Sequence, residues 1–554
     1  MLQSNSLQAL ATFTLAWVAW RVLRRFFRPD PLAHVPGLNP PSWIAGSLAE
    51  IFHPDAWDFH DSMSEKYGGV FKCQGFFGAP VLYVHDPTAL RYIATKDQSL
   101  FEGTDDMILA QKIVFGPGLL STIGSVHRKQ RKVMNPVFST TQVRALRPVS
   151  YDVAHELSEA LSRQIPQGMS TFDMLDWMER VVLETTARGI LGSTFDALNE
   201  TLNPPYLVSL KNFIRVMTFP EFIFPRLLIL PYIWNIGPAW LRRWLVGVLP
   251  WKNLHVLRDM VDTMHNTSLE LLRSRQGGVD GHEATVSAND GGRLDILTVL
   301  LKANLAASEE DKMSEPELLG QITTITFGAL STTASALSRL LWVLCENPDV
   351  QEKVRQEVSD ALNGGRDIEY DALMSLPLLD AVVKETFRVY TPLPLIVKQS
   401  TTDTVIPLSK PYPSADGSTF SEIPIAPKTY IVVALNACNR DPAIWSDDAR
   451  EWKPERWLKP LPDTVTNAKI PGVYSNQMSF YGGPKACIGY KFAELEIKII
   501  MSLLLSKFRF SFGHKQIIWK MNGINQPMVA ADDELDDFGL PRLQMPLHVS
   551  LVND

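Results

Sequence analysis

The sequence predicts a mostly α-helical protein with a small β region, preceded by one N-terminal membrane anchor helix. Apolar residues recur every three or four positions through residues 140–199, which is the spacing of amphipathic helices. A helical pattern also runs without a break through residues 314–347. Strand-like runs are short and few, as in residues 67–92, where glycines split two of them before a helical pattern takes over. An uncharged run at residues 7–20 predicts the anchor.

Length and composition favour a globular protein with a large core. The chain has 554 residues, of which 45% are apolar and 20% are charged. The net charge of -7 argues against a nucleic-acid-binding protein, because such proteins usually carry a basic face. The cysteines Cys73, Cys345, Cys438 and Cys487 form no CxxC pair, so neither a zinc site nor a disulfide framework is expected.

The flanks of the uncharged run indicate how it lies in a membrane. Residues 7–20 are followed by Arg21, Arg24, Arg25 and Arg28. The run is shorter than the ~20 residues of a typical spanning helix, but Arg21 can extend toward the headgroups. No Lys or Arg precedes the run, unlike in a cleaved signal peptide. The positive-inside rule then places the N-terminus in the lumen and the rest of the chain in the cytosol. A signal peptide or a buried helix is the alternative.

Residues 219–251 form a second apolar segment, but its prolines and arginines exclude a second spanning helix. Its tryptophans are typical of residues at headgroup level. We therefore expect a surface that enters the membrane interface, with a buried core loop as the alternative. The polar, glycine-rich residues 274–293 predict a loop.

The helical pattern of residues 314–347 has clear end signals. Ser314 and Glu317 match a capping box, and Pro316 lies in the first turn. An Asn-Pro step at residues 347–348 ends the pattern. A helix of this length must cross most of the protein body.

One cysteine has an unusual setting near the C-terminus. The segment SFYGGPKACIGYKF places Cys487 in a glycine-rich loop that leads into a helical pattern. Glycines let backbone N–H groups approach the sulfur, and the N-terminal end of the following helix is positive. Both features lower the pKa of a thiol and so favour the thiolate, which is the form that binds a metal. For a cysteine taken alone, a small buried hydrophobic residue is the alternative.

Four further segments accompany this loop. HRKQR holds His127 and Arg131, and FGALSTTAS lies within the central helical pattern. KETFR supplies Glu385 and Arg388, and WKPERW supplies Arg456. The loop itself matches FxxGxRxCxG, with Lys in the place of Arg. Together the five motifs resemble those of the cytochrome P450 family over the whole chain, and the anchor and loops are similar to those of membrane-anchored microsomal members from fungal secondary metabolism.

The resemblance implies the cytochrome P450 fold, with an anchor over residues 1–28, a proline-rich linker over residues 29–45 and a haem-thiolate catalytic domain over residues 46–554. It implies haem b as the cofactor and Cys487 as the axial ligand of its iron. A thiolate ligand donates electron density to the iron and favours O–O cleavage. The other loop residues expected around the haem are Phe480, Gly483, Lys485 and Gly489.

Cationic side chains are expected to hold the haem propionates. By resemblance these are Arg131, His127 and Lys485, and Lys398 is a further candidate. Lys supplies a charge but not the rigid fork of Arg. A solvated surface charge is the alternative for each of them.

Glu385 and Arg388 lie at positions i and i+3 and therefore share one face of a helix. With Arg456 they are expected to form a buried, bidentate network that fixes the core around the Cys487 loop. A surface ion pair of little energetic value is the alternative.

Within the central helix, the resemblance places an alcohol at Thr332 and gives Ser331 the place of the usual acid. Gly328 and Ala329 would leave room for oxygen. Serine does not titrate, although it can hold a water molecule in a proton relay. Hydrogen bonds from these hydroxyls back to the helix are the alternative. Pocket walls are expected from Phe327, Ala329, Leu393 and Ile396.

The resemblance implies a haem-thiolate monooxygenase that hydroxylates a lipophilic small molecule, terpenoid or steroid-like, with O2. Electrons from NADPH would arrive through a separate cytochrome P450 reductase, with cytochrome b5 as a further partner, because no flavin domain follows Cys487. The expected docking residues are Arg128, Lys129, Arg131 and Lys132. We expect a single-pass protein of the endoplasmic reticulum membrane, with a cytosolic catalytic domain and no nucleic-acid partner.

Three alternatives stay open. Ser331 suits a haem-thiolate isomerase or dehydratase that needs no reductase, whereas the retained Thr332 argues against it. A non-catalytic haem-binding sensor would need neither the long helix nor a reductase. A membrane-tethered helical scaffold without haem would be colourless.

Overall fold

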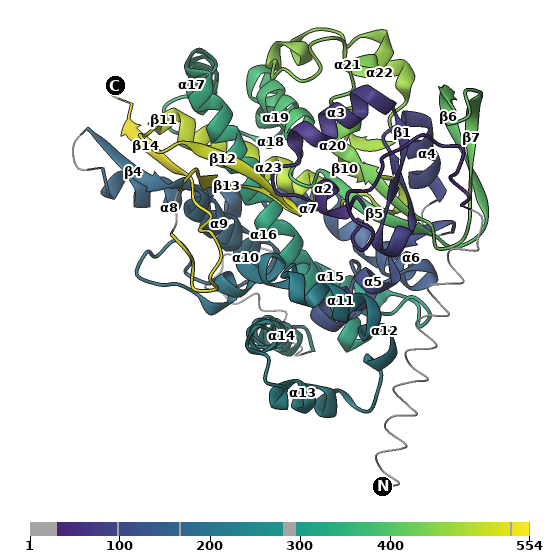
Figure 1. Cartoon of the computed structure of the whole chain (residues 1–554). Coiled ribbons are helices and arrows are strands. Elements are labelled where there is room, and N and C mark those ends of the chain that lie inside the picture. The colour runs from purple at the N-terminus through teal and green to yellow at the C-terminus, as the bar shows by residue number, and fades with distance from the viewer. Residues whose placement is uncertain (1–29, 97–98, 166–167, 281–294, 532–533, 553–554) are drawn as a thin grey trace.

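Helices dominate the structure, a computed structural model, and strands form a smaller region (Figure 1). The structure describes residues 30–96, 99–165, 168–280, 295–531 and 534–552. The anchor expected over residues 1–28 lies outside this part of the chain. For the described residues, the predicted fold class of mostly α with a small β region is confirmed.

The helices fall into two groups along the chain. Those before the central helix are α2 (Leu48–Ile51), α3 (Trp57–Tyr67), α4 (Pro87–Lys96), α5 (Asp105–Phe115), α6 (Gly124–Met134), α7 (Thr140–Ala145), α8 (Arg147–Arg163), α9 (Met174–Thr185), α10 (Pro205–Met217), α11 (Pro220–Leu228), α12 (Leu230–Ile233), α13 (Ala239–Val248), α14 (Lys252–Asp280) and α15 (Ile296–Ala306). The central helix and those after it are α16 (Glu315–Glu346), α17 (Pro348–Leu362), α18 (Tyr370–Met374), α19 (Pro377–Val389), α20 (Leu435–Asn439), α21 (Pro442–Trp445), α22 (Asp463–Ala468) and α23 (Tyr490–Lys507).

The largest sheet has five strands in the order β1-β2-β8-β5-β3. These strands are β1 (Val70–Gln74), β2 (Pro80–Val84), β8 (Tyr430–Ala434), β5 (Leu395–Ser400) and β3 (Phe101–Gly103). Only the β2–β8 pair of this sheet is parallel. Strands β1 and β2 followed by α4 match the order predicted for residues 67–92.

Smaller sheets complete the β region. A three-stranded sheet has the order β11-β14-β4, and three hairpins pair β6 with β7, β9 with β10 and β12 with β13. These strands are β4 (Met169–Asp173), β6 (Thr404–Pro413), β7 (Thr419–Ile425), β9 (Gly472–Tyr474), β10 (Gln477–Gly482), β11 (Phe508–Phe512), β12 (Ile517–Asn522), β13 (Ile524–Val529) and β14 (Pro546–Leu551). In Figure 1 the β6–β7 hairpin and the β4–β14 sheet lie at opposite sides of the helical body.

The central helix α16 crosses the helical body, where it packs against α9, α10, α14, α19 and α23 (Figure 1). Its predicted capping box is formed, because the Ser314 side chain and the Glu317 side chain each bond the other's backbone N–H. The helix ends at Glu346, directly before the Asn-Pro step. Within the described residues, α16 is the one helix long and apolar enough to span a bilayer, but its most apolar window is 72% buried inside the protein.

The apolar segment of residues 219–251 forms α11, α12 and α13 on the surface. None of the residues of α13 is buried, and Trp240 is 70% exposed. In Figure 1 this helix stands apart from the main body, beside α14. The exposure agrees with the predicted surface and contradicts the alternative of a buried core loop. The prediction of a loop over residues 274–293 is wrong up to Asp280, because these residues belong to α14, and the rest of the segment lies outside the described residues.

Candidate active site

The Cys487 loop connects the β9–β10 hairpin to a helix. A short 3₁₀ turn, η5 (Gly483–Lys485), follows β10, and α23 begins at Tyr490 with Gly489 as its N-cap. The backbone N–H of Cys487 donates to the carbonyl oxygen of Phe480 at 3.0 Å, which closes the loop on itself. The sulfur is therefore carried two residues before the positive end of an 18-residue helix.

Phe480 fixes this loop against the core. Its ring lies 5.0 Å from that of Phe387 in α19 and 5.3 Å from that of Tyr474 in β9, measured between centroids. Tyr490 at the start of α23 approaches it from the other end of the loop, at 6.0 Å. These aromatic contacts join both ends of the loop to α19.

The two loop glycines have different surroundings. Gly483 has a φ of +68°, a conformation that favours glycine, and a Cβ there would collide with the backbone carbonyl of Ala94 in α4. Gly489 has an ordinary φ of -90°, and a Cβ there would meet no atom within 4 Å. The turn and the contact with α4 therefore require Gly483, whereas the space beside Gly489 is open to a bound group.

The Cys487 side chain is exposed, although the preceding residue, Ala486, is buried. Burial raises the pKa of its thiol, while the backbone N–H of Gly489 and the charge of Arg131 lower it. These findings are compatible, because the sulfur borders open space while the protein around that space limits its hydration. The thiol form is favoured until a metal ion displaces the proton. Among the described residues, no group of three or more His, Cys, Asp or Glu side chains could hold a metal ion.

Basic side chains from three elements gather beside the loop. His127 and Arg131 lie on α6, Lys485 on η5 and Lys398 on β5. Arg131 donates from Nη1 to the carbonyl oxygen of Ala486 at 2.9 Å, directly next to the cysteine. The structure therefore brings together all four residues that were expected to hold the propionates.

The pKa of His127 responds to the charges of these cations. Burial, and after it the positive charges of Lys485, Arg131, Lys398 and Arg128, lower this pKa to about 3. Cations gathered in a poorly hydrated place repel one another unless anions bind there. The two propionates of haem b are such anions, and the open space beside Gly489 leaves room for the ring. The residues present therefore fit this cofactor.

Lys485 is also held by protein groups. Its Nζ donates to the carbonyl oxygen of Thr122 at 2.9 Å and lies 3.8 Å from the carboxylate of Glu102. A protein carboxylate thus shares this cation with any bound anion. An Arg at this position would have further N–H donors, so it could bond both the Glu102 carboxylate and a bound anion.

Glu385 and Arg388 are fully buried in α19. Arg388 donates from Nε and Nη2 to the two carboxylate oxygens of Glu385, at 2.8 and 2.7 Å. Arg456 is the looser member, since its Nε lies 3.5 Å from Glu385 while its Nη2 donates to Asp448 at 2.8 Å. The structure brings the expected three residues together, with Asp448 as an additional partner.

The sequence pattern did not predict Trp457 as part of this network. Its indole Nε1 donates to Oε2 of Glu385 at 2.9 Å. Trp457 directly follows Arg456 in WKPERW, so an indole donor next to an expected member of the network was the available signal.

The network reaches the Cys487 loop through backbone groups. Arg388 donates to the carbonyl oxygen of Asn439 at 2.9 Å. The Asn439 side-chain oxygen in turn accepts from the backbone N–H of Met478 in β10 at 2.7 Å. The ion pair therefore positions the strand that leads to Cys487.

The middle of α16 borders open space on one face. Gly328 is exposed, and a Cβ there would meet no atom within 4 Å. Thr332 is half-buried and donates from Oγ1 to the carbonyl oxygen of Gly328 at 2.7 Å. Ser331, the residue directly before Thr332, is buried. The back-bond considered as an alternative is thus present at Thr332, but a hydroxyl oxygen that donates can still accept a proton or a hydrogen bond.

Phe327, one of the expected pocket residues, has two aromatic neighbours that the sequence did not predict. Phe327 is half-buried, and its ring centroid lies 4.6 Å from that of Phe115 in α5 and 5.8 Å from that of Phe213 in α10. Ala329, Leu393 and Ile396 are also half-buried. Aromatic side chains from three helices therefore meet beside Gly328, and sequence distance concealed this meeting.

The expected docking residues on α6 do not form one basic patch. Lys129 lies 2.9 Å from Glu317, and Lys132 lies 2.5 Å from Asp311. Arg131 points to the Cys487 loop. Arg128 remains on the rim of a surface depression of about 450 Å³ that Lys129, Lys132 and Asp311 also line. The basic face expected from the sequence is partly neutralised.

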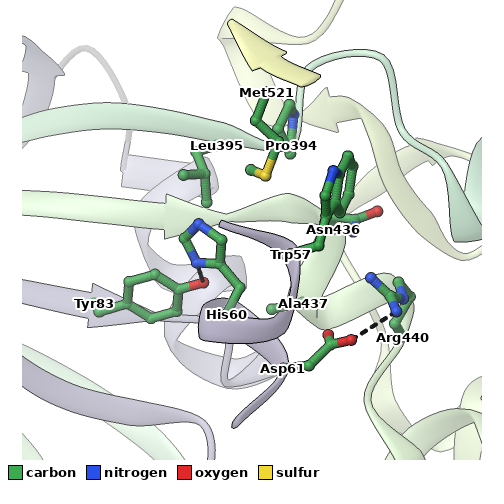
Figure 2. A pocket seen from close by; sticks show the side chains of 10 residues that line it. All are labelled: Trp57, His60, Asp61, Tyr83, Pro394, Leu395, Asn436, Ala437, Arg440 and Met521. Atoms are coloured by element: carbon green, nitrogen blue, oxygen red, sulfur yellow. Dashed lines mark hydrogen bonds and ion pairs between the residues drawn. The ribbon is translucent and has the colours of Figure 1, made fainter. Parts of the chain in front are cut away.

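A separate small cavity lies between α3, β2, β5 and α20 (Figure 2). Its volume of about 10 Å³ has room for about one water molecule. His60 points into it, with Nδ1 2.9 Å from the Tyr83 hydroxyl and Nε2 3.0 Å from the carbonyl oxygen of Ile51. Because a carbonyl only accepts, Nε2 carries the proton and Nδ1 accepts from Tyr83. Burial lowers the pKa of His60 to about 4, so this site is a neutral structural contact.

Comparisons with known proteins agree with the geometry. The cytochrome P450 family model matches residues 36–530. The chain is similar to cytochrome P450 monooxygenase 91 of Postia placenta, with 40% identity over 540 residues that cover 98% of each chain. Cytochrome P450 monooxygenase 81 of the same fungus is 39% identical over 96% of this chain and 95% of that protein. Ganoderic acid synthetase CYP5150L8 of Ganoderma lucidum is 37% identical over 95% of this chain and 97% of that protein.

Proposed function

The chain belongs to the cytochrome P450 family and is a haem-dependent monooxygenase, and we propose that it hydroxylates a lipophilic small molecule of the terpenoid or steroid-like class. Its cofactor is haem b. The relative named ganoderic acid synthetase and the exposed apolar surface of α11–α13 support this substrate class. The observation that carries the proposal is the meeting of α6, β5 and the Cys487 loop in one cationic cluster beside an exposed cysteine.

We assign Cys487 as the axial ligand of the haem iron. When bound, the haem supplies the iron that activates O2, and a thiolate ligand promotes O–O cleavage. Burial raises the pKa of the Cys487 thiol, and the Gly489 backbone N–H and the Arg131 charge offset part of this cost of forming the thiolate. It also positions the sulfur through the bond from Cys487 N–H to Phe480, the aromatic packing of Phe480, and the open space beside Gly489.

His127, Arg131, Lys398 and Lys485 are proposed to bind the propionates. Their mutual repulsion is relieved when carboxylates bind beside them. Their interaction with the propionates of the cofactor is therefore favourable. His127 is expected to become protonated more readily when anions lie beside it, because opposite charges raise the pKa of a base.

Thr332 is proposed to hold and pass a proton on the open face of α16. Its hydroxyl is anchored to the Gly328 carbonyl and borders the space that Gly328 leaves open. Ser331 has the place of the usual acid but is buried, so we propose that solvent supplies the protons and that Ser331 contributes at most a bound water. Phe327, Ala329, Leu393 and Ile396 are proposed to contact the apolar substrate.

The electron donor is proposed to be a separate NADPH-dependent cytochrome P450 reductase, with cytochrome b5 as an additional donor. Arg128 is the residue we favour for docking, since Lys129 and Lys132 are engaged by Glu317 and Asp311. A negatively charged partner would compete with those two acids for the lysines.

The membrane of the endoplasmic reticulum is the proposed location. The helices α11–α13 supply a lipid-facing surface next to α5, to which they are tied by Arg226 at 3.3 Å from Asp106. Lys112 of α5 also lies 5.2 Å from the ring centroid of Trp234. A lipophilic substrate dissolved in the bilayer would thus meet the protein beside the helix that carries Phe115.

The proposal is tested by the absorption spectrum of the reduced, CO-bound protein and of Cys487→Ala. We expect a Soret band strongly red-shifted from that of His-ligated haem in the wild type and its loss in the variant. Cys345→Ala, which removes a cysteine from α16 far along the chain from the loop, is the matched control and should keep the band. A colourless wild type, or an unchanged band in Cys487→Ala, would refute the assignment.

Substrate turnover then separates the reaction classes. With reductase and substrate present, NADPH consumption with oxygenated product supports a monooxygenase. Product formation without reductase would instead support a haem-thiolate isomerase or dehydratase, which the serine at position 331 suits.

A further inference from the structure

Tyr481 lies in the Cys487 loop in a strained backbone conformation. Its φ is +57°, in the left-handed region that a bulky residue rarely adopts. Its side chain is only 7% exposed and packs in the hydrophobic cluster under the five-stranded sheet. Strain of this kind persists only where surrounding contacts compensate for it, and it is often found at functional sites.

The ring of Tyr481 contacts a buried cation. The Lys398 ammonium lies 5.3 Å from the ring centroid, within the range of a cation–π interaction. Lys398 is only 6% exposed, because it lies on β5 in the middle of the sheet between β3 and β8. An ammonium in such a place has lost most of its hydration, and an aromatic face replaces part of it.

Lys398 belongs to the cationic cluster beside the haem site. It pairs with Gly103 on β3, next to Glu102, whose carboxylate lies 3.8 Å from Lys485, and its charge also acts on His127. We propose that Tyr481 is a positioning residue that holds the Lys398 ammonium in this cluster, the group of cations that would bind the propionates. The inference rests on the proposed function, because it takes the propionates as the anions that the cluster binds. The loop that carries Cys487 thereby also positions the charge of Lys398, through Tyr481, which lies six positions before the cysteine.

The left-handed backbone of Tyr481 explains how one loop can both hold Cys487 and direct the Tyr481 ring to Lys398. The carbonyl oxygen of the preceding residue, Phe480, accepts the Cys487 N–H, so the chain on that side is fixed by the cysteine. On the other side, Gly482 and Gly483 turn against Pro471 and Ala94. With both neighbours fixed, only the conformation at Tyr481 is left to direct the ring to Lys398.

The test uses the full-length holoenzyme and variants that delete or retain the ring. Tyr481→Leu and Tyr481→Gly delete it, and the glycine variant also suits the left-handed backbone, so it removes the ring without adding strain. Tyr481→Phe retains the ring. We would measure the rate of haem transfer to a haem-scavenging apoglobin and the Fe(III)/Fe(II) midpoint potential.

We expect haem transfer from the ring-deleting variants to be faster by about 2- to 30-fold, the range that a cation–π interaction gives, and Tyr481→Phe to remain near the wild-type rate. The midpoint potential should fall in the ring-deleting variants, because a cation near the propionates favours the reduced, less positive iron. Tyr67→Leu, which removes a ring 5.0 Å from Lys66 outside the cluster, is the matched control and should behave as the wild type.

A double-mutant cycle with Lys398→Met decides whether the ring acts through the lysine. The inference requires that deletion of the ring has no further effect on haem transfer in the Lys398→Met background. Equal effects in both backgrounds, or a Lys398→Met variant with wild-type haem transfer, would overturn it. The CO spectrum of the wild type separates the two proposals. If the thiolate-type band is absent, the proposed function fails. If the band is present and the cycle gives either overturning result, only the role of Tyr481 fails.

Discussion

The indole N–H of Trp457 donates to Oε2 of Glu385 at 2.9 Å, and the same oxygen accepts from Nε of Arg388 at 2.8 Å. A neutral donor thus joins an ion pair that is fully buried. Burial of two charges is costly unless their hydrogen-bonding groups are satisfied, so each donor to Glu385 stabilises the network that positions β10 and the Cys487 loop.

We predict that Trp457→Phe destabilises the protein by about 2 kcal/mol, because it leaves a buried carboxylate oxygen one donor short while keeping an aromatic ring. The measurement is urea unfolding followed by circular dichroism. Trp452→Phe is the matched control, since Trp452 donates to the neutral hydroxyl of Thr386 at 3.0 Å and its loss should cost only about 1 kcal/mol. A Trp457 variant no less stable than the control would contradict the prediction.

The buried His60 predicts a dependence of stability on pH. Burial lowers its pKa from 6.5 to about 4 in the folded protein. The unfolded chain therefore binds a proton at higher pH than the folded chain does. The contribution of neutral His60 to the free energy of unfolding is complete above pH 6.5 and is lost as the pH falls toward 4, by about 3 kcal/mol in total.

This loss should disappear in His60→Gln, which keeps a donor for Ile51 and an acceptor for Tyr83 without titrating. The measurement is the free energy of unfolding of both proteins at several pH values between 7 and 4. Parallel pH profiles for the two proteins would show that His60 does not make the contribution assigned to it.

The sequence predicted best the features that depend on neighbouring residues. The capping box at Ser314 and Glu317 and the end of α16 before the Asn-Pro step are local hydrogen-bonding and steric signals, and both are present. The pairing of Glu385 with Arg388 follows from their spacing on one helix. The family motifs predicted that His127 and Arg131 of α6 meet at the Cys487 loop, although α6 is far from it in the chain, and Lys398 of β5 was a further candidate.

Features that depend on packing between distant segments could not be predicted. The partners of Lys129 and Lys132 come from the loop and helix around residues 311–317, so a basic stretch that looks like a docking face is partly neutralised. The left-handed conformation of Tyr481 is also invisible in the sequence, because nothing local favours it. The burial of Ser331 beside the half-buried Thr332 depends on which face of α16 borders open space.

Thr332 and Ser331 provide a matched pair for the proton relay. We predict that Thr332→Ala lowers the amount of product formed per NADPH consumed by at least about tenfold, because a hydroxyl on the open face of α16 is removed. Ser331→Ala should stay within about twofold of the wild type, since Ser331 is buried. The measurement is product and hydrogen peroxide yield with reductase present. If Ser331→Ala has the larger effect, the open face does not carry the proton.

The exposed surface of α11–α13 predicts membrane binding that is independent of the N-terminal segment. Trp240 and Trp244 lie one helical turn apart on α13 and are 70% and 58% exposed, and no residue of this helix is buried. Large rings kept in water have no role in the core, whereas at a bilayer interface their apolar bodies leave water and their N–H groups stay hydrated. We expect a variant that lacks residues 1–29 still to sediment with phosphatidylcholine vesicles.

Trp240→Ser/Trp244→Ser in the same shortened chain should weaken this partitioning by at least about tenfold, because burial of each ring removes on the order of 150–250 Å² from water. Met169→Ser is the matched control: Met169 is 54% exposed on β4, away from α13, and its loss should leave partitioning unchanged. Failure of the shortened chain to sediment, or equal sedimentation of the double variant, would show that this surface does not contact lipid. If the double tryptophan variant binds vesicles like the shortened chain and Met169→Ser does not bind them, the lipid contact lies at the β4 end instead.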